Sequence, residues 1–328
     1  MRRREFITLF VGATTWPFVA RAQQAGAVRR VGILIDYAES DPAAQSLAAA
    51  FRGELAKLGW AEDSNLRIEL RWSAGNADRI RTFAKELVDL RPDAILGRGT
   101  PETGALIRET HTIPIVFALV SDPITSGFTT SLAHPDGNAT GFALYEPTMG
   151  GKWVAILKEI APRTVRVALL FNPTTAPPLE LFMPSIQAAA TSLDVQVSVA
   201  SVHAREEIEG VIAALARDPG GALIVMPDSF NVTNRDLIIA LAVRYRVPAI
   251  SDNRFYTESG GLINYGSDFT EQFRKAAAYV DRILRGTKPA DLPIQQPTKF
   301  DIVINLKTAK ALDLTVPTSL LVAAQVIE

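Results

Sequence analysis

The chain has 328 residues, of which 48% are hydrophobic, so it is long and apolar enough for two ordinary globular domains. Its formal net charge is only -1, and its lysines and arginines are dispersed, so the basic face that a nucleic-acid partner requires is not expected. The chain contains no cysteine, which excludes disulfides, thiolate metal sites, cysteine nucleophiles and lipidated cysteines together.

The first predicted element is a signal peptide over residues 1–22. The segment MRRREFITLFVGATTWPFVARAQQ has a basic start, an apolar stretch and the small-residue motif ARA, so we expect cleavage after Ala22 and a periplasmic protein. Its RRREFI string resembles a twin-arginine signal. A membrane anchor is the alternative, but the apolar stretch is shorter than the roughly 20 residues that span a bilayer.

Strands and helices are predicted to alternate from residue 28 onwards. The apolar run VRRVGILID (28–36) predicts a strand, and LRIELRW (66–72), DAILGRG (93–99) and IPIVFAL (113–119) predict three more, each after a helical segment. The same order restarts at residue 165 with VALLFNP, VQVSVAS, ALIVMPD and VPAISDN. Apolar strands separated by helices favour parallel sheets covered on both faces. The fold class is therefore α/β, with two similar doubly wound parallel-sheet lobes.

Turn-rich segments predict where the lobes join. We expect the first lobe to comprise residues 28–125 and about 256–290, and the second lobe residues 145–253 and about 298–328. The glycine- and proline-rich segments 126–144, 254–266 and 287–297 are predicted to be hinge crossovers. A hinge of several strands restricts the two lobes to opening and closing.

Several short motifs are spread along the chain: RRREFI, IPIVF, SDP, GNATG, QQPTKF, VINLKTAKAL and VP. In these motifs the sequence resembles the substrate-binding proteins of ABC importers over essentially its whole length. The resemblance implies the type I periplasmic binding protein fold and a monomer that binds a small-molecule solute. It also implies ABC permease and ATPase subunits at the inner membrane as partners, and no cofactor.

Ligands of open parallel α/β sheets bind beyond the carboxyl ends of the strands, so residues at those ends are the candidate site. The first-lobe candidates are Asp36, Tyr37, Gly97, Arg98, Gly99, Thr100, Ser121 and Asp122. The second-lobe candidates are Tyr145, Asn172, Asp228, Asn253 and Phe255.

The segment GRGT at 97–100 is the predicted anion site, because free N–H groups and the dipole at a helix start favour a carboxylate. Arg98 would either add a bidentate contact or pair with a surface carboxylate. Asp122 and Asp228 would either bind an ammonium group or cap a helix. The three aromatic candidates would either stack on the solute or pack within the protein.

Enzyme signatures are missing from the sequence. It has no GxSxG or GxxxxGK[ST] motif, and its three histidines have no metal-ligand spacing. We therefore expect a receptor. The anion site at Thr100 and the carboxyl groups of Asp122 and Asp228 suit an amino-acid-like solute, and an aromatic solute is the next choice. Two alternatives stay open: a periplasmic sensor that serves a membrane receptor, and an exported α/β hydrolase that uses Asp122 or Asp228 as a base.

Overall fold

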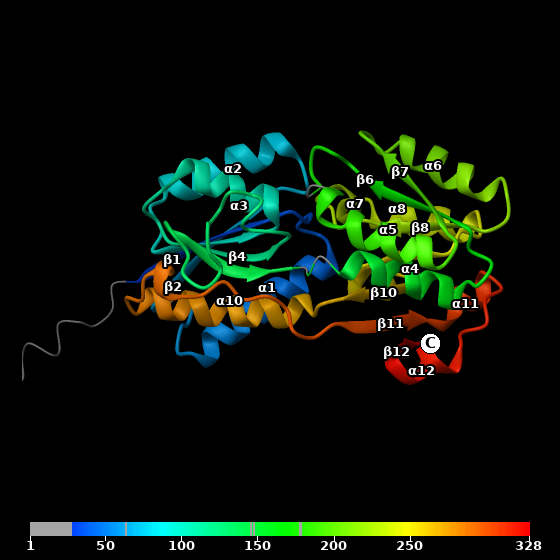
Figure 1. Ribbon diagram of the computed structural model, residues 1–328. Helices are drawn as coiled ribbons and strands as arrows, with labels where there is room; N and C mark the ends of the chain where they lie inside the picture. Colours follow the sequence, from blue (N-terminus) through cyan, green and yellow to red (C-terminus); the bar gives the residue numbers. More distant parts are fainter. Residues whose placement is uncertain (1–27, 63, 145, 147, 177–178) are drawn as a thin grey trace, which may run out of the picture.

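The computed structural model describes residues 28–62, 64–144, 146, 148–176 and 179–328. The predicted signal peptide lies outside these residues. The described chain forms two α/β lobes that lie side by side (Figure 1). None of the helices in this part of the chain combines the length and the apolar character that crossing a membrane requires.

The first lobe is built on a sheet of five parallel strands in the order β2-β1-β3-β4-β5. Successive β1 side chains point to opposite faces, so Ile33 and Ile35 pack with α1 and α10 while Leu34 packs with α2 and α3. The strands are β1 (Arg29–Ile35), β2 (Leu66–Trp72), β3 (Ala94–Arg98), β4 (Ile115–Val120) and β5 (Ala139–Ala143). The helices are α1 (Pro42–Lys57), α2 (Ala77–Asp89), α3 (Thr100–Glu109), α10 (Phe269–Leu284) and the 3₁₀ turn η3 (Pro289–Asp291).

The second lobe is built on a seven-stranded sheet in the order β12-β11-β10-β9-β8-β6-β7. All neighbours pair in parallel except β10 and β11. The strands are β6 (Arg166–Phe171), β7 (Gln196–Ser201), β8 (Gly221–Val225), β9 (Ala249–Ser251), β10 (Ile263–Gly266), β11 (Asp301–Asn305) and β12 (Ala324–Ile327). The helices are α4 (Met149–Ile160), α5 (Met183–Ser192), α6 (Glu207–Ala216), α7 (Ser229–Thr233), α8 (Arg235–Arg244), α9 (Arg254–Glu258), α11 (Leu306–Ala311), α12 (Thr318–Ala323) and the turn η2 (Leu179–Leu181).

The repeat predicted from the sequence is present in both sheets. The order β2-β1-β3-β4-β5 of the first lobe recurs as β7-β6-β8-β9-β10 in the second. The four strand pairs recognised in the sequence occupy equivalent places in these two orders. The predicted fold class is therefore confirmed, and β11 and β12 extend the second sheet beyond the repeat.

Two segments expected to be hinge crossovers contain elements of the lobes themselves. Residues 139–143 form β5, whose side chains are all buried against the first lobe. Gly141 has a φ of 153°, and a Cβ there would lie 2.0 Å from the carbonyl oxygen of Phe117, so only glycine allows this close pairing. Residues 254–266, which the sequence placed partly in the first lobe, form α9 and β10 of the second lobe.

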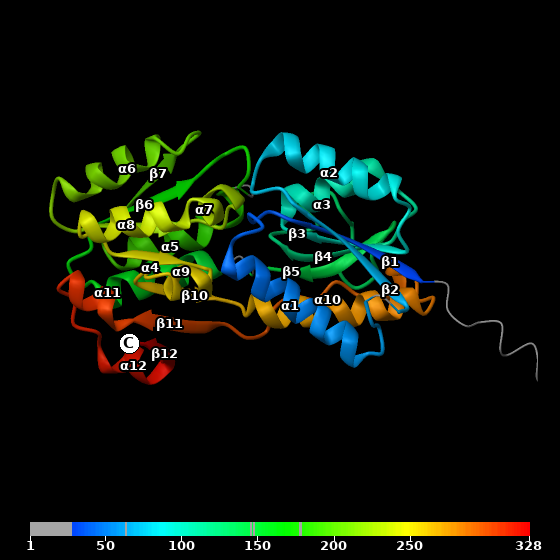
Figure 2. The ribbon, with the colours of Figure 1, turned by 180° about the vertical axis from the view of Figure 1, so that it is seen from behind.

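The chain passes between the lobes after β5, between β10 and α10, and between η3 and β11. The first and third crossovers lie side by side, since the Ala143 N–H donates to the Gln295 carbonyl oxygen at 2.8 Å. Helix α10 returns to the first lobe and packs along α1, as Figure 2 shows from behind. These three crossovers join the lobes, and strand-end residues of both lobes line one cavity between them.

Candidate functional site

The candidate site is a cavity between the lobes, at the carboxyl ends of the strands. Its volume is about 40 Å³. The cleft is therefore narrow. Its first-lobe lining is Asp36, Arg98, Gly99, Thr100, Pro101, Leu119, Ser121, Leu144 and Phe269, and its second-lobe lining is Thr175, Pro227, Asp228, Ser229, Val232, Asp252 and Asn253.

An ion pair between Arg98 and Asp36 forms the floor of the cavity on the first-lobe side. Arg98 is 4% exposed and donates to the Asp36 carboxylate, while its guanidinium carbon lies 4.5 Å from the centre of the Tyr37 ring. Burial opposes the charge of Arg98, but Asp36 and Tyr37 more than offset this and raise its pKa. Arg98 thus stays charged, yet its charge is largely balanced within the protein.

The start of helix α3 forms the adjoining wall. Gly99 caps this helix with a φ of 82°, which leaves Thr100 and Pro101 at the cavity. The Thr100 hydroxyl accepts a hydrogen bond from the Ser121 N–H at 3.2 Å. The register between β4 and β5 shifts at Leu119, which has a φ of 61° and faces the same cavity. Bulges of this kind re-aim side chains at functional edges.

Glu102 lies buried behind this helix start and was not predicted from the sequence. Its carboxyl accepts a hydrogen bond from the Ser73 hydroxyl at 2.9 Å. Burial, aided by the nearby Asp36 carboxylate, raises the pKa of Glu102 to about 8. Burial thus favours the neutral form of Glu102.

Asp228 is the main acidic group on the second-lobe side. It caps α7 by accepting from the Phe230 N–H at 2.9 Å, and it also accepts from the Thr175 hydroxyl at 2.5 Å and the Asn172 N–H at 2.6 Å. Burial outweighs these hydrogen bonds and raises the pKa of Asp228 to about 6. Asp228 is thus a helix cap that also lines the cavity, and its binding of an ammonium group stays a prediction.

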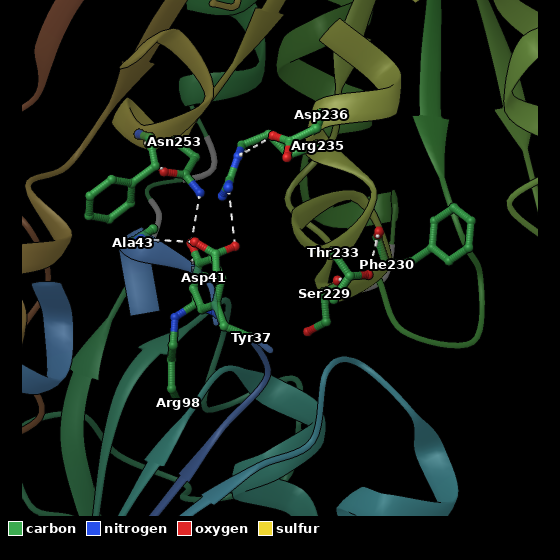
Figure 3. A network of polar contacts seen from close by, with 11 residues as sticks. Tyr37, Asp41, Ala43, Arg98, Ser229, Phe230, Thr233, Arg235, Asp236 and Asn253 are labelled. Atoms are coloured by element: carbon green, nitrogen blue, oxygen red, sulfur yellow. Dashed lines mark hydrogen bonds and ion pairs between the residues drawn. The ribbon is translucent and has the colours of Figure 1, made fainter. Parts of the chain in front are cut away.

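Two polar contacts join the lobes beside the cavity (Figure 3). The Asn253 amide donates to the Tyr37 hydroxyl at 3.1 Å. Arg235 at the start of α8 pairs with Asp41 at the start of α1, with 3.1 Å between Nη2 and Oδ2. The side chains of Arg235 and Asp41 are only 9% and 14% exposed. These two contacts hold the lobes against each other in this structure.

Metal binding is not indicated by the described residues, which contain no cluster of three or more histidine, aspartate or glutamate side chains able to hold an ion. The polar groups of the cavity are instead hydrogen-bond donors, acceptors and carboxylates. This arrangement can hold a polar solute.

A family model described as ABC transporter substrate binding protein matches residues 34–327. The chain belongs to this family. It is 24% identical over 288 residues to the tyrosine-binding protein of Clostridioides difficile, a match that covers 87% of this chain and 81% of that protein.

Solved structures show the same fold for this substrate-binding protein. A conserved domain protein from Vibrio cholerae has a TM-score of 0.84 and 26% identity, covering 92% of this chain and all of that one. An ABC domain from Streptococcus pneumoniae, in complex with L-Trp, has a TM-score of 0.82 and 24% identity, covering 91% and 99%. The type I periplasmic binding protein fold predicted from the sequence is confirmed.

The structure of this substrate-binding protein brings seven of the thirteen predicted site residues to the cavity: Asp36, Arg98, Gly99, Thr100, Ser121, Asp228 and Asn253. Tyr37 lies directly beneath Arg98 and meets the second lobe through Asn253. Gly97 lies behind the cavity wall formed by the start of α3, where a Cβ would approach the Thr103 hydroxyl oxygen to 2.9 Å.

Three predicted residues lie away from the cavity lining of this substrate-binding protein. Asp122 caps a surface turn by accepting from the Ile124 N–H at 2.9 Å. Asn172 uses its N–H to hold Asp228, and Phe255 packs against the core instead of facing the cleft. Tyr145 lies outside the described residues.

Other lining residues were missed because their sequence signals are ordinary. Asp252 directly follows strand β9, so it could have been selected by the same rule that selected Asn253. Ser229 begins α7 and Thr175 lies in the loop after β6, and each stands four residues beyond the end of its strand. Asp41 and Arg235 resemble routine helix-start residues, and only the packing of the lobes brings them together.

Proposed function

We propose that this chain is the exported solute-binding component of an ABC importer, and that it traps an amino acid with an aromatic or otherwise apolar side chain between its lobes. The supporting observation is a cavity whose walls come from both lobes and which has different chemistry on each side. A solute that contacts both walls binds the closed form better than the open one, and this difference in affinity drives closure.

The two walls suit the two ends of a zwitterion. On the first lobe, the start of α3 and the hydroxyls of Thr100 and Ser121 offer partners to a carboxylate. On the second lobe, Asp228 and Asp252 offer carboxyl groups to an ammonium. The apolar contacts come from Leu119, Leu144, Pro227, Val232 and Phe269. The names of similar proteins, a tyrosine-binding protein and an ABC domain with bound L-Trp, support the same class of solute.

The proposal includes export through residues 1–22, a monomeric receptor in the periplasm, and delivery of the solute unchanged to a permease and its ATPase. The motif RRREFI supports the twin-arginine route. The family supports transport, because its members are substrate-binding proteins of ABC transporters.

The test is to titrate the mature protein with L-tyrosine, L-tryptophan and L-phenylalanine by calorimetry, with small-angle scattering before and after. We expect micromolar or tighter binding of at least one amino acid, compaction on binding, and recovery of the solute unaltered. Asp228→Asn should weaken binding at least about tenfold, because a charge-assisted bond to the ammonium is lost.

Asp122→Asn is the matched control, since Asp122 also caps a turn after a strand but lies outside the cavity. It should bind like the unaltered protein. Equal affinity of the two variants, or tight binding without compaction, would contradict the proposed site. A chemically altered solute would instead indicate an enzyme.

A further inference from the structure

A second, smaller cavity lies in the second lobe next to the interlobe cavity. The two cavities share the wall residues Asp228, Val232, Asp252 and Asn253. The smaller one has a volume of about 20 Å³. A single water requires roughly 10–15 Å³ on this measure, so the cavity has room for about one water-sized group.

Three buried polar side chains line this cavity, and each has an atom without a hydrogen-bond partner among the described residues. The atoms are Asn231 Oδ1, Arg235 Nη1 and the Tyr256 hydroxyl oxygen. The three residues are 2%, 8% and 2% exposed. Buried polar groups in folded proteins are nearly always hydrogen-bonded, because leaving one unpaired costs about 1–3 kcal/mol. Three such atoms at one small cavity indicate a bound group.

The hydrogen bonds around these residues determine what the cavity offers. Both Asn231 amide hydrogens are used, since Nδ2 donates to the carbonyl oxygens of Leu170 at 2.8 Å and Met226 at 2.9 Å. The remaining Asn231 oxygen is therefore an acceptor. Burial raises the pKa of Tyr256, so its hydroxyl stays neutral and can donate or accept. Arg235 Nη1 can only donate.

The charges around the cavity limit the bound group to a neutral one. A cation would face the Arg235 guanidinium, and an anion would face the carboxyl groups of Asp228 and Asp252. A solute hydroxyl can donate its one hydrogen to Asn231 and accept from both Arg235 and Tyr256, whereas a water, with two hydrogens, can also donate to Tyr256. We propose that this cavity is a subsite for one neutral hydroxyl group, which comes from a water molecule or from the hydroxyl of the bound solute.

The subsite connects the solute to the interlobe contact. Arg235 uses Nη2 to pair with Asp41 of the first lobe, and Nη1 is the atom left for the subsite (Figure 3). A hydroxyl held at Nη1 would therefore orient the guanidinium for its contact with the first lobe. The case in which the bound solute supplies this hydroxyl rests on the proposed function. The case in which a water molecule supplies it does not.

The first experiment is a pair of crystal structures of the unliganded protein, unaltered and as Tyr256→Phe. We expect density for one water within hydrogen-bond distance of Tyr256, Asn231 and Arg235 in the unaltered protein, weakened or displaced in the variant. If the protein binds no amino acid, the proposed function fails, and these structures still decide whether the subsite exists.

The second experiment uses L-tyrosine and L-phenylalanine, which differ by one hydroxyl. If the solute supplies the group, the unaltered protein should prefer L-tyrosine at least about tenfold, and Tyr256→Phe should remove most of that preference. If water supplies it, the preference should be unchanged in Tyr256→Phe, and the water should persist in the complex. Tyr245→Phe is the matched control, because its hydroxyl bonds Glu209 on the lobe surface at 2.7 Å.

Crystals of the unliganded and liganded protein with no density at these three atoms, together with equal preferences in the unaltered protein and Tyr256→Phe, would overturn the proposal. A charged ion at the cavity would also overturn it, because the argument admits only a neutral group.

Discussion

Removing the charge of Asp41 should open the lobes without unfolding them. Asp41 caps α1 by accepting from the Ala43 N–H at 2.8 Å, and it pairs with Arg235 of the second lobe. Asn caps a helix about as well as Asp, so Asp41→Asn keeps the cap and removes only the interlobe ion pair. The variant therefore tests closure of the lobes without changing the stability of α1.

The expected loss follows from the partial burial of the pair. Exposed ion pairs contribute about 0.2–1 kcal/mol, whereas removing one partner of a fully buried pair costs about 3–5 kcal/mol. With side chains 9% and 14% exposed, the Arg235–Asp41 pair lies between these limits. We expect the free energy that favours the closed form to fall by about 1–3 kcal/mol. This corresponds to a fall of about five- to 150-fold in the ratio of closed to open protein.

The assay is a double-mutant cycle of Asp41→Asn and Arg235→Gln, with the closed fraction measured by fluorescence transfer between dyes on the two lobes. Arg244→Gln is the control, because Arg244 forms an exposed ion pair with Glu209 inside the second lobe. The free energy that favours the closed form should fall little more in the double variant than in either single variant. If the two losses add within about 0.5 kcal/mol, or if Arg244→Gln opens the lobes equally, the pair does not hold the closed form.

Three further predictions concern single residues. Affinity for an amino acid should rise with pH until Asp228, whose pKa burial raises to about 6, is ionised; calorimetry should show this rise abolished in Asp228→Asn. The pKa of Glu102 is raised to about 8, so the folded state keeps a proton that the unfolded state loses, and the unfolding free energy should fall between pH 4.5 and about 8 by at most about 1.4 kcal/mol per unit. Denaturant titrations of Glu102→Gln should lack most of this fall. Gly266→Ala should lower the unfolding free energy by about 1–3 kcal/mol, since its Cβ would lie 1.7 Å from the Asp252 carbonyl oxygen, whereas Gly210→Ala, with nothing within 4 Å, should not.

Local sequence patterns were sufficient to predict the core strands and their repetition. Runs such as VGILID and VALLFNP are apolar because both faces of a parallel strand are covered, and this requirement leaves the same pattern in each lobe. The patterns failed at β5 and β10, because ATGFA and INYG contain glycine and are short, so they resemble turns. Glycine is needed at Gly141 and Gly266 because the backbones of Phe117 and Asp252 pack closely against them. Both partners lie more than ten positions away in the sequence.

The sequence by itself determined which residues stand at strand ends and helix starts, since these positions follow from neighbouring residues. Only the tertiary structure decided which of them meet. Asp122 and Asp228 have the same local cap pattern, yet only Asp228 lines the cavity. Arg98 and Asp36 are 62 residues apart, and Arg235 and Asp41 are 194 apart. Partners at such separations are set by strand order and lobe closure, and no local spacing encodes them, because the chain between them contributes only its length and path.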